Sequence, residues 1–306
     1  MKKSLLAVVV LAASLAGASR AVACSVCACG DPLLAGNDPA AIAGQLRLQL
    51  DSEYLTVSAA SEEMPGATDQ LTQWSARFNA VYRPLERLSL LLTVPATNKS
   101  MSVVGHGLEE PMSSLTGLGD VELAARATAW KSVSLSTGRV HEVGFSAGTG
   151  LPTGASGAVD SAGMRYNEHA QVGTGSFSPF GGVHYHFEQR QWLALASLSG
   201  RARTVNSYGY RYGAALLWSL HGQYRVIRPL ALDLGLDGRA AAADASEGVA
   251  VNNTGGTVLS LAPGAYFNVA GKVWLFVRAQ LPVFQRLSGE QAVGPTASAG
   301  LQFQAL

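Results

Sequence analysis

The sequence predicts an all-β protein, a transmembrane up-and-down antiparallel β-barrel of about twelve strands, and three observations lead to this fold class. Roughly a dozen stretches alternate apolar and polar residues, which is the two-residue period of a β-strand. The connections between them are by turns short and long. Only 14% of the 306 residues are charged, below the quarter or so that is usual in soluble domains, which indicates a surface that faces lipid.

Residues 1–23 are predicted to be a signal peptide for export. Lys2 and Lys3 give a positive start, and Ala21-Val22-Ala23 forms an A-x-A cleavage site. The apolar stretch between them is shorter than the roughly 20 residues that a helical span needs, and no later segment is a continuous apolar run of that length. An exported membrane protein without helical spans can satisfy its backbone only as a closed barrel. We therefore expect a periplasmic Cys-containing segment at 24–45 and an outer-membrane barrel at 46–306.

The first six strands are each indicated by a run of alternating residues. The first sets leucines against charged side chains, and the second sets Trp74 and Phe78 against Gln73 and Arg77. A tight turn at 83–87 leads into the third strand. The predicted bounds are Leu46–Val57, Thr72–Tyr82, Leu88–Pro95, Val121–Trp130, His141–Gly150 and Ser176–Phe187.

The last six strands follow the same rule, most clearly at Tyr210–Val226. There the even-numbered positions are mostly apolar, with aromatic residues near both ends, and the odd-numbered positions are mostly polar or charged. Short turns at 188–191, 227–229 and 270–272 join successive strands. The predicted bounds are Trp192–Thr204, Tyr210–Val226, Leu230–Ala240, Val258–Val269, Val273–Phe284 and Ala297–Phe303.

The remaining connections are long loops that are polar or rich in glycine. One loop between the third and fourth strands is predicted to contain Gly105, Gly107, Pro111 and Gly117. Because the short links fall on one rim of the barrel, they are assigned to the periplasm and the long loops to the outside. An even number of strands leaves both chain ends on the periplasmic side.

The alternation also assigns a face to each side chain. Both charge signs mix on the lumen face, with a modest surplus of arginine, which argues against a selectivity ring of a single sign. Two interpretations stay open, a solute-selective lining and a network of ion pairs that fills the interior. The predicted lipid-facing residues include Trp74, Phe78, Leu90, Leu92, Trp192, Leu198, Leu216, Trp218, Leu232, Leu234, Leu275, Val277 and Phe303. The predicted lumen-lining residues are Arg47, Asp51, Glu53, Arg77, Glu122, Arg126, Arg201, Arg203, Arg211, His221, Arg225, Asp233, Asp237, Arg239 and Arg278.

Three short motifs in the middle of the chain resemble a known family. They are Gly117-Leu-Gly-Asp120 before a strand, Gly150-Leu-Pro-Thr-Gly154 at the end of the next strand, and Gly173-Thr-Gly-Ser176 entering a third. This pattern is similar to that of the outer-membrane barrels of the MetA-pathway-of-phenol-degradation family. The resemblance implies a transporter-like outer-membrane barrel that passes small, often hydrophobic molecules, and it implies no catalytic residues.

All three cysteines lie in one cluster, Cys24, Cys27 and Cys29. This C-x-x-C-x-C spacing can bring three thiolates around a soft metal such as copper or zinc. A disulfide that leaves one cysteine over is also compatible with an oxidising periplasm. If the signal is cut after Ala23, Cys24 becomes the first residue and could carry a lipid. These alternatives stay open.

Two further groups of residues could carry chemistry. His184, His186 and Glu188 share the lumen face of one strand and could hold a divalent metal, although polar filling of the lumen explains them as well. Ser219 and His221 also share a face, but no nucleophile-elbow motif accompanies them, so no enzyme is predicted. The net charge of +1 and the lack of a basic patch argue against nucleic-acid binding.

The sequence thus favours an outer-membrane channel or transporter for a small, hydrophobic or aromatic solute. One alternative is a barrel whose N-terminal Cys segment serves metal handling or electron transfer, with periplasmic metal or redox proteins as partners. A second alternative is a structural barrel without transport. Outer-membrane lipid is the expected surrounding in each case.

Overall fold

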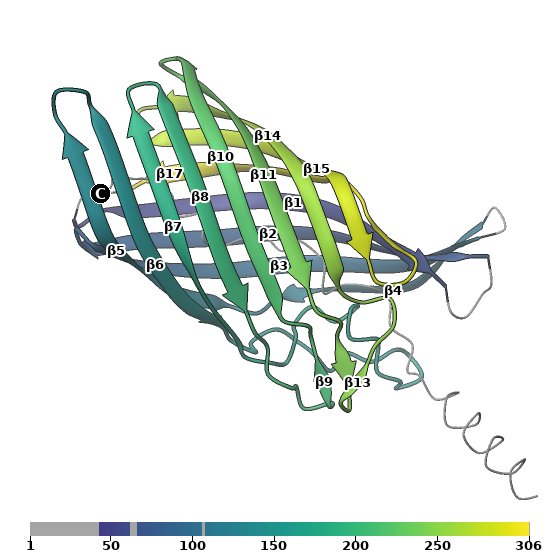
Figure 1. Cartoon of the computed structure of the whole chain (residues 1–306). Helices are drawn as coiled ribbons and strands as arrows, with labels where there is room; N and C mark the ends of the chain where they lie inside the picture. The colour runs from purple at the N-terminus through teal and green to yellow at the C-terminus, as the bar shows by residue number, and fades with distance from the viewer. Residues whose placement is uncertain (1–42, 62–65, 106–107, 306) are drawn as a thin grey trace, which may run out of the picture.

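The computed structural model describes residues 43–61, 66–105 and 108–305, which form a closed antiparallel β-barrel (Figure 1). The wall has twelve strands. β4 and β5 both pair with β3 and together form one interrupted wall strand, and β16 and β17 both pair with β1 and form another. The predicted fold class is confirmed. No helix in these described ranges is both long enough and apolar enough to span a membrane.

The strands alternate in direction along the chain, and each of the twelve predicted strands corresponds to one strand of the wall. Their bounds are β1 (Leu46–Ala60), β2 (Thr68–Leu85), β3 (Leu88–Gly105), β4 (Leu108–Leu118), β5 (Glu122–Ser134), β6 (Arg139–Gly150), β7 (Ser178–Gln189), β8 (Trp192–Arg201), β9 (Tyr210–Arg211), β10 (Ala215–Ile227), β11 (Leu230–Ala241), β12 (Ala245–Ser246), β13 (Val249–Ala250), β14 (Gly256–Ala270), β15 (Val273–Leu287), β16 (Gln291–Val293) and β17 (Thr296–Gln304).

The first and last wall strands close the ring. β1 pairs with β2 along its whole length and with β17 from Arg47 to Tyr54. The hairpin turns between β2 and β3, β5 and β6, β7 and β8, β10 and β11, and β14 and β15 all lie at one end, which we call the short-turn end. The opposite end carries the long loops, together with β9 and β13, and we call it the long-loop end (Figure 1).

One predicted loop is wrong. The segment that follows Pro95 continues as β3 to Gly105 and returns as β4 instead of forming an irregular loop. The outer face of this extension carries polar residues such as Asn98 and Ser100. We infer that the strands here pass beyond the lipid, where an apolar outer face is no longer required, so the alternation typical of a membrane strand fades.

A second correction concerns the predicted strand Tyr210–Val226. The wall strand β10 begins only at Ala215, while Tyr210 and Arg211 form β9 in a separate three-stranded sheet with β12 and β13. Arg211 is exposed there and does not face the lumen, contrary to the prediction. The chain enters the wall just after Gly213, whose amide donates to the Asp244 carboxylate at 2.7 Å.

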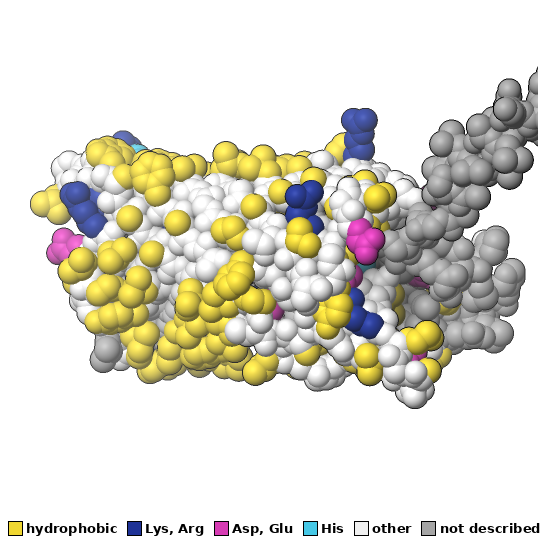
Figure 2. All heavy atoms as spheres, turned by 90° about the horizontal axis from the view of Figure 1, so that it is seen from below, with side chains coloured by type: hydrophobic (Ala, Val, Ile, Leu, Met, Phe, Trp, Pro, Cys, Tyr) yellow, Lys and Arg dark blue, Asp and Glu magenta, His cyan; other side chains and the backbone are white. Residues whose placement is uncertain are grey.

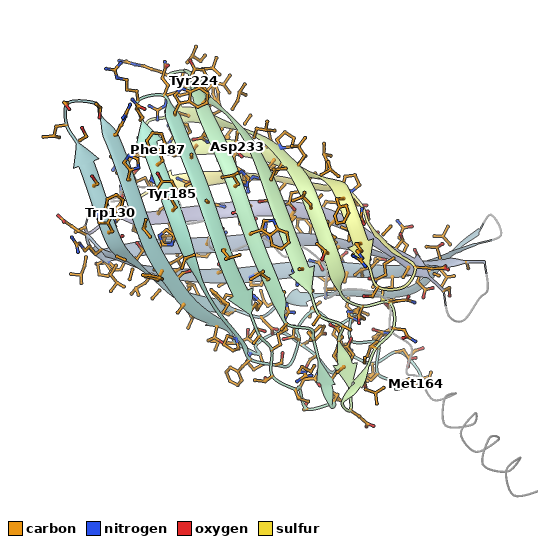
Figure 3. The ribbon with its side chains drawn as sticks, in the orientation of Figure 1. Trp130, Met164, Tyr185, Phe187, Tyr224 and Asp233 are labelled. Carbon is orange, nitrogen blue, oxygen red and sulfur yellow. The ribbon has the colours of Figure 1, made fainter. Side chains whose placement is uncertain are left out.

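The outer wall is apolar between the two ends. Figure 2 shows hydrophobic and uncharged side chains over this surface, with few charged ones. Leu234 and Val277 are each 57% exposed, as expected for side chains that lie against lipid chains. Exposed aromatic side chains, Trp130, Tyr185 and Tyr224, lie toward the short-turn end (Figure 3), where a barrel needs an interfacial girdle.

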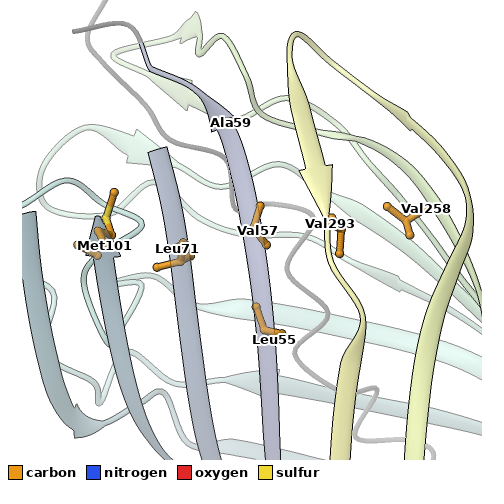
Figure 4. Close-up of a cluster of buried hydrophobic side chains, with 8 residues drawn as sticks. Leu55, Val57, Ala59, Leu71, Met101, Val258 and Val293 are labelled. Carbon is orange, nitrogen blue, oxygen red and sulfur yellow. The ribbon is translucent and has the colours of Figure 1, made fainter. Parts of the chain in front are cut away.

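The interior is also apolar at the long-loop end. Leu55, Val57, Leu71 and Met101 point inward and pack with Val258, Val293 and the loop residue Ala170 (Figure 4). The inward face of β1 therefore changes from charged residues to aliphatic ones along a single strand. This apolar cluster, which the sequence analysis did not predict, closes part of the barrel interior.

We predict that the folding free energy lost on placing a charge on the outer wall depends on how deep in the membrane the substituted residue lies. Leu234→Arg puts a cation in the middle of β11 and should cost about 2–4 kcal/mol of folding free energy in lipid. Ile227→Arg, at the short-turn end of β10, should cost only about 0–1 kcal/mol because the guanidinium can reach the interface. Urea unfolding from lipid vesicles measures both. Equal costs would contradict the assignment of β11 to the membrane.

Candidate functional site

A cavity of about 610 Å³ lies in the lumen of the barrel. Its lining runs from Gly271, in a short turn, to His169 and Thr174, in the long loop at 151–177. It therefore extends along the barrel from the short-turn end to the long loop.

Most of the predicted lumen residues border this cavity. The charged residues that do so are Arg47, Asp51, Glu53, Arg77, Glu122, Arg201, Arg203, Arg225, Asp233 and Arg278. Four other predicted lumen residues lie in the interior. Arg126, His221 and Arg239 are buried, and the Asp237 side chain is 13% exposed. The structure thus places both charge signs in the lumen.

On the wall formed by β1 and β2, charged side chains neutralise one another. The Arg77 guanidinium donates to Asp51 at 2.8 Å and to Glu53 at 3.0 and 3.2 Å. Asn79 donates to the other oxygen of Asp51 at 2.8 Å and accepts from Thr93. Because each acceptor is used and the pairs are partly desolvated, this network stiffens the wall more than it attracts ions.

A second network lies on β10 and β11. The two ring nitrogens of His221 lie 2.9 Å from Asp233 and 2.9 Å from Asp237. A carboxylate only accepts, so both nitrogens donate and the imidazole is cationic. Gly235 pairs with His221 across the two strands, and a Cβ on Gly235 would overlap the ring. The glycine therefore lets the histidine lie flat between the two aspartates.

Aromatic side chains form another part of the lining. Tyr266, Trp274 and Phe276 border the cavity, and the rings of Tyr266 and Phe276 stack with their centroids 5.8 Å apart. The sequence analysis missed these residues. The signal was present, because Trp274 and Phe276 share the parity of the inward-facing Arg278, opposite to Leu275 and Val277.

The three motifs that carry the family resemblance meet at Asp120. Its carboxylate accepts hydrogen bonds from the Gly154 amide at 2.9 Å, from the Thr174 amide at 2.8 Å and from the Thr174 hydroxyl at 2.5 Å. Gly154 and Gly173 approach so closely that a Cβ on either would overlap the other's backbone. We call this contact the Asp120 junction. It fixes both ends of the long loop to the barrel wall.

The tip of the same loop enters the mouth of the barrel. Lys99 Nζ, on β3, donates to the carbonyls of His169 and Gln171 at 3.2 and 2.7 Å. Gln171 is fully buried and ties the loop together through both of its amide atoms. Together with Ala170 in the apolar cluster, these contacts make the loop the boundary of the cavity at the long-loop end.

His169 lies at the centre of a buried polar group in the loops. Its Nε2 is 3.0 Å from the Tyr210 hydroxyl, which donates to Asp244 at 2.7 Å. Burial lowers the pKa of His169 to about 4, although the Asp244 carboxylate acts in the opposite direction. The imidazole is therefore neutral while the loop is packed.

The predicted metal ligands gain no support from the geometry. His184, His186 and Glu188 do share the inward face of β7, but within the described residues no three His, Cys, Asp or Glu side chains are arranged to hold a metal ion. Arg126 also lies near His184, which disfavours a cation. Polar filling of the lumen is the better interpretation. Cys24, Cys27 and Cys29 lie outside the described residues, so their metal, disulfide and lipid alternatives stay predictions.

The pair Ser219 and His221 does not form a nucleophile and its base. The Ser219 hydroxyl contacts Ser197 Oγ at 2.7 Å, and both nitrogens of His221 are occupied by aspartates. An imidazole that donates from both nitrogens has no lone pair with which to accept a proton. The absence of an enzymatic role stays a prediction.

Comparisons with known proteins place the fold. The chain matches no family model and no curated protein. Among solved structures it is similar to the COG4313 outer membrane channel from Pseudomonas putida F1, with 15% identity and a TM-score of 0.65 over 88% of this chain and 98% of that one. The translocator domain of the autotransporter NalP from Neisseria meningitidis is less similar, with 10% identity and a TM-score of 0.44 over 85% and 88% of the two chains. The CymD monoaromatic hydrocarbon channel has 11% identity and a TM-score of 0.42 over 87% and 90%.

At these identities the first likeness shows a shared fold, and the two weaker ones carry no argument. The class that the fold and the apolar outer wall define is that of transmembrane antiparallel β-barrels. The narrower resemblance to the phenol-degradation family stays a prediction, since no family model matches.

We predict that Gly235→Ala destabilises the barrel by about 1–3 kcal/mol through overpacking, because His221 is held on both sides and cannot move away. Gly222→Ala is the matched control on β10, since its Cβ would meet only the Leu234 carbonyl at 4.0 Å. Urea unfolding in vesicles compares the two variants. The same unfolding midpoint for both would show that the His221 position is adaptable.

We also predict that acid loosens the long loop. A displaced His169 has an ordinary pKa near 6.5, so between about pH 6.5 and pH 4 the displaced loop binds a proton that the packed loop does not. The packed loop should lose about 3 kcal/mol across this window as the pH falls. Amide hydrogen exchange of residues 166–174, corrected for intrinsic rates, measures this loss.

His169→Gln should remove the pH dependence of that exchange. His141→Gln, which changes a histidine at the short-turn end, should retain it. Persistent pH dependence in His169→Gln would assign the effect to another group.

Proposed function

We propose that this protein is an outer-membrane channel for a small solute with an apolar or aromatic part. The observation that carries the proposal is the cavity of about 610 Å³, which extends from the short turns to the long loop inside a closed barrel. Its volume lies within the range of about 300–1,000 Å³ that is usual for small-molecule sites.

The chemistry of the lining favours a solute that is bound through its apolar part as well as through polar groups. Arg77 is neutralised by Asp51 and Glu53, and Arg201 pairs with Glu122. The aromatic faces of Tyr266, Trp274 and Phe276 offer apolar contact between these polar groups. A solute could therefore exchange weak contacts along the wall, which favours transit because no single contact is strong enough to trap it.

The long loop at 151–177 is the barrier in this proposal. In the packed position its tip is bound to Lys99 on β3, and its two ends are fixed at the Asp120 junction. Opening at the long-loop end requires the tip to leave the mouth of the barrel. We place that end outside the cell, because outer-membrane barrels carry their longer loops there.

Solute flux distinguishes the channel from the alternative, a structural barrel without transport. Purified protein in planar bilayers or solute-loaded liposomes should show solute flux above that of empty membranes if the channel proposal holds. Absence of flux, both with the loop intact and with residues 157–171 replaced by a short glycine-serine linker, would retire the channel and favour the structural barrel.

We predict that Asp120→Ala increases conductance. The substitution leaves the amides of Gly154 and Thr174 without their acceptor, at a cost of about 1–3 kcal/mol. This cost shifts the equilibrium toward the displaced loop by about 5- to 150-fold. Asp160→Ala is the matched control, because the Asp160 carboxylate accepts from the amides of Ala162 and Met164 within the exposed turn of the same loop. Single-channel recording compares the open probabilities. An increase of the same size in both variants would contradict a special role of the junction.

A further inference from the structure

A row of inward-facing residues crosses four adjacent strands near the short-turn end. In the register of the sheet, Arg225 on β10 pairs with Ala231 on β11, Ala231 with Tyr266 on β14, and Tyr266 with Phe276 on β15. Three of these side chains, those of Arg225, Tyr266 and Phe276, border the cavity. Ala231 between them carries only a methyl group, so no longer side chain separates the guanidinium from the stacked rings.

Arg225 differs from three other arginines of the cavity. Arg77, Arg201 and Arg278 each form an ion pair with an acidic residue of the wall. Within the part of the chain that the structure describes, the Arg225 guanidinium has no hydrogen bond or ion pair with another side chain, although it borders the cavity. Its charge is therefore available to a molecule in the lumen.

The two rings of the same row are held in place by their neighbours. Arg278 Nη2 donates to the Tyr266 hydroxyl at 3.0 Å, which fixes the tyrosine, and the Tyr266 and Phe276 planes lie 28° apart with their centroids 5.8 Å apart. Phe276 in turn lies over Gly300 of β17, where a side chain would overlap its ring. Trp274 extends the aromatic surface toward the short-turn end of the same strand.

From this arrangement we infer that the Arg225 row is a binding site for an aromatic carboxylate in transit through the lumen. The guanidinium presents a planar fork that matches a carboxylate with two parallel hydrogen bonds. The Tyr266 and Phe276 rings offer stacked or edge contacts to the aromatic body. The site rests on the proposed channel function, and it narrows the solute from any small molecule with an apolar or aromatic part to one that carries both a ring and a carboxylate.

The row lies near the short-turn end, close to the exit on the periplasmic side in our assignment. Figure 3 shows Tyr224, the neighbour of Arg225, at this end of the barrel, and Asp233 one row farther into the barrel. Asp233 is engaged by His221 at 2.9 Å, so it does not compete for Arg225. A site at the exit adds selectivity after the loop has opened.

The test compares three probe molecules, which distinguish the contribution of the carboxylate to binding from that of the aromatic ring. Benzoate carries both a carboxylate and a ring, acetate carries only the charge, and benzyl alcohol carries only the ring. Isothermal titration calorimetry on the detergent-solubilised full chain should show benzoate binding more tightly than either of the other two. Equal affinity for benzoate and acetate would overturn the aromatic part of the inference.

Arg225→Gln should weaken benzoate binding by about tenfold or more and leave benzyl alcohol unchanged, because only the charge-assisted hydrogen bonds are lost. Arg225→Lys should keep part of the affinity, since the charge remains without the planar fork. Arg228→Gln removes the same charge from the exposed tip of the adjacent turn and should leave benzoate binding as it is in the unmodified protein. Loss of benzoate binding in both glutamine variants, or in neither, would overturn the site.

Flux into liposomes, measured separately, distinguishes this inference from the channel proposal. Benzoate binding that depends on Arg225 but is accompanied by no flux of any probe would retire the channel and support the site. Flux of all three probes with equal benzoate affinity in Arg225→Gln and the unmodified protein would support the channel and overturn the site.

Discussion

The constraint on which this structure depends is the closed ring of backbone hydrogen bonds. β1 pairs with β2 on one side and with β17 on the other, so the sheet meets itself and leaves no unpaired edge in the lipid. Closure fixes the parity of every wall strand, because a slip of one residue would turn the leucines inward and the charges outward. The polar networks of the lumen, the aromatic lining and the apolar outer wall all follow from that parity.

At three places in the barrel wall, a planar side chain lies over a glycine of the neighbouring strand. His221 lies over Gly235 and Phe276 over Gly300 on the inside, while Trp218 lies over Gly238 in the same way. Because each glycine has no Cβ, a large planar group can lie flat against the sheet at that position. This arrangement explains how a barrel of twelve strands holds bulky side chains and still encloses a cavity.

The strands could be predicted from the sequence because alternation reports a wall with lipid outside and polar groups inside. Alternation gave wrong predictions where the interior is not polar or where the chain is not part of the wall. At Leu55 and Val57 the interior itself is apolar, and at Tyr210 the chain has already left the wall for the loops. The Asp120 junction could not be foreseen, since it joins three segments whose proximity depends on the loop fold. The aromatic lining at Trp274 and Phe276 was readable from parity, but large apolar residues were expected only on the lipid side.

The Asp120 junction has a consequence for how the outer surface can diverge. The wall holds both ends of the long loop. The turn between Val159 and Arg165 is closed by an isolated β-bridge between these two residues and leaves Met164 67% exposed. Substitutions or insertions in that turn need not disturb the register of any strand. The exposed turn can therefore tolerate changes of sequence and length that the barrel wall beneath it cannot.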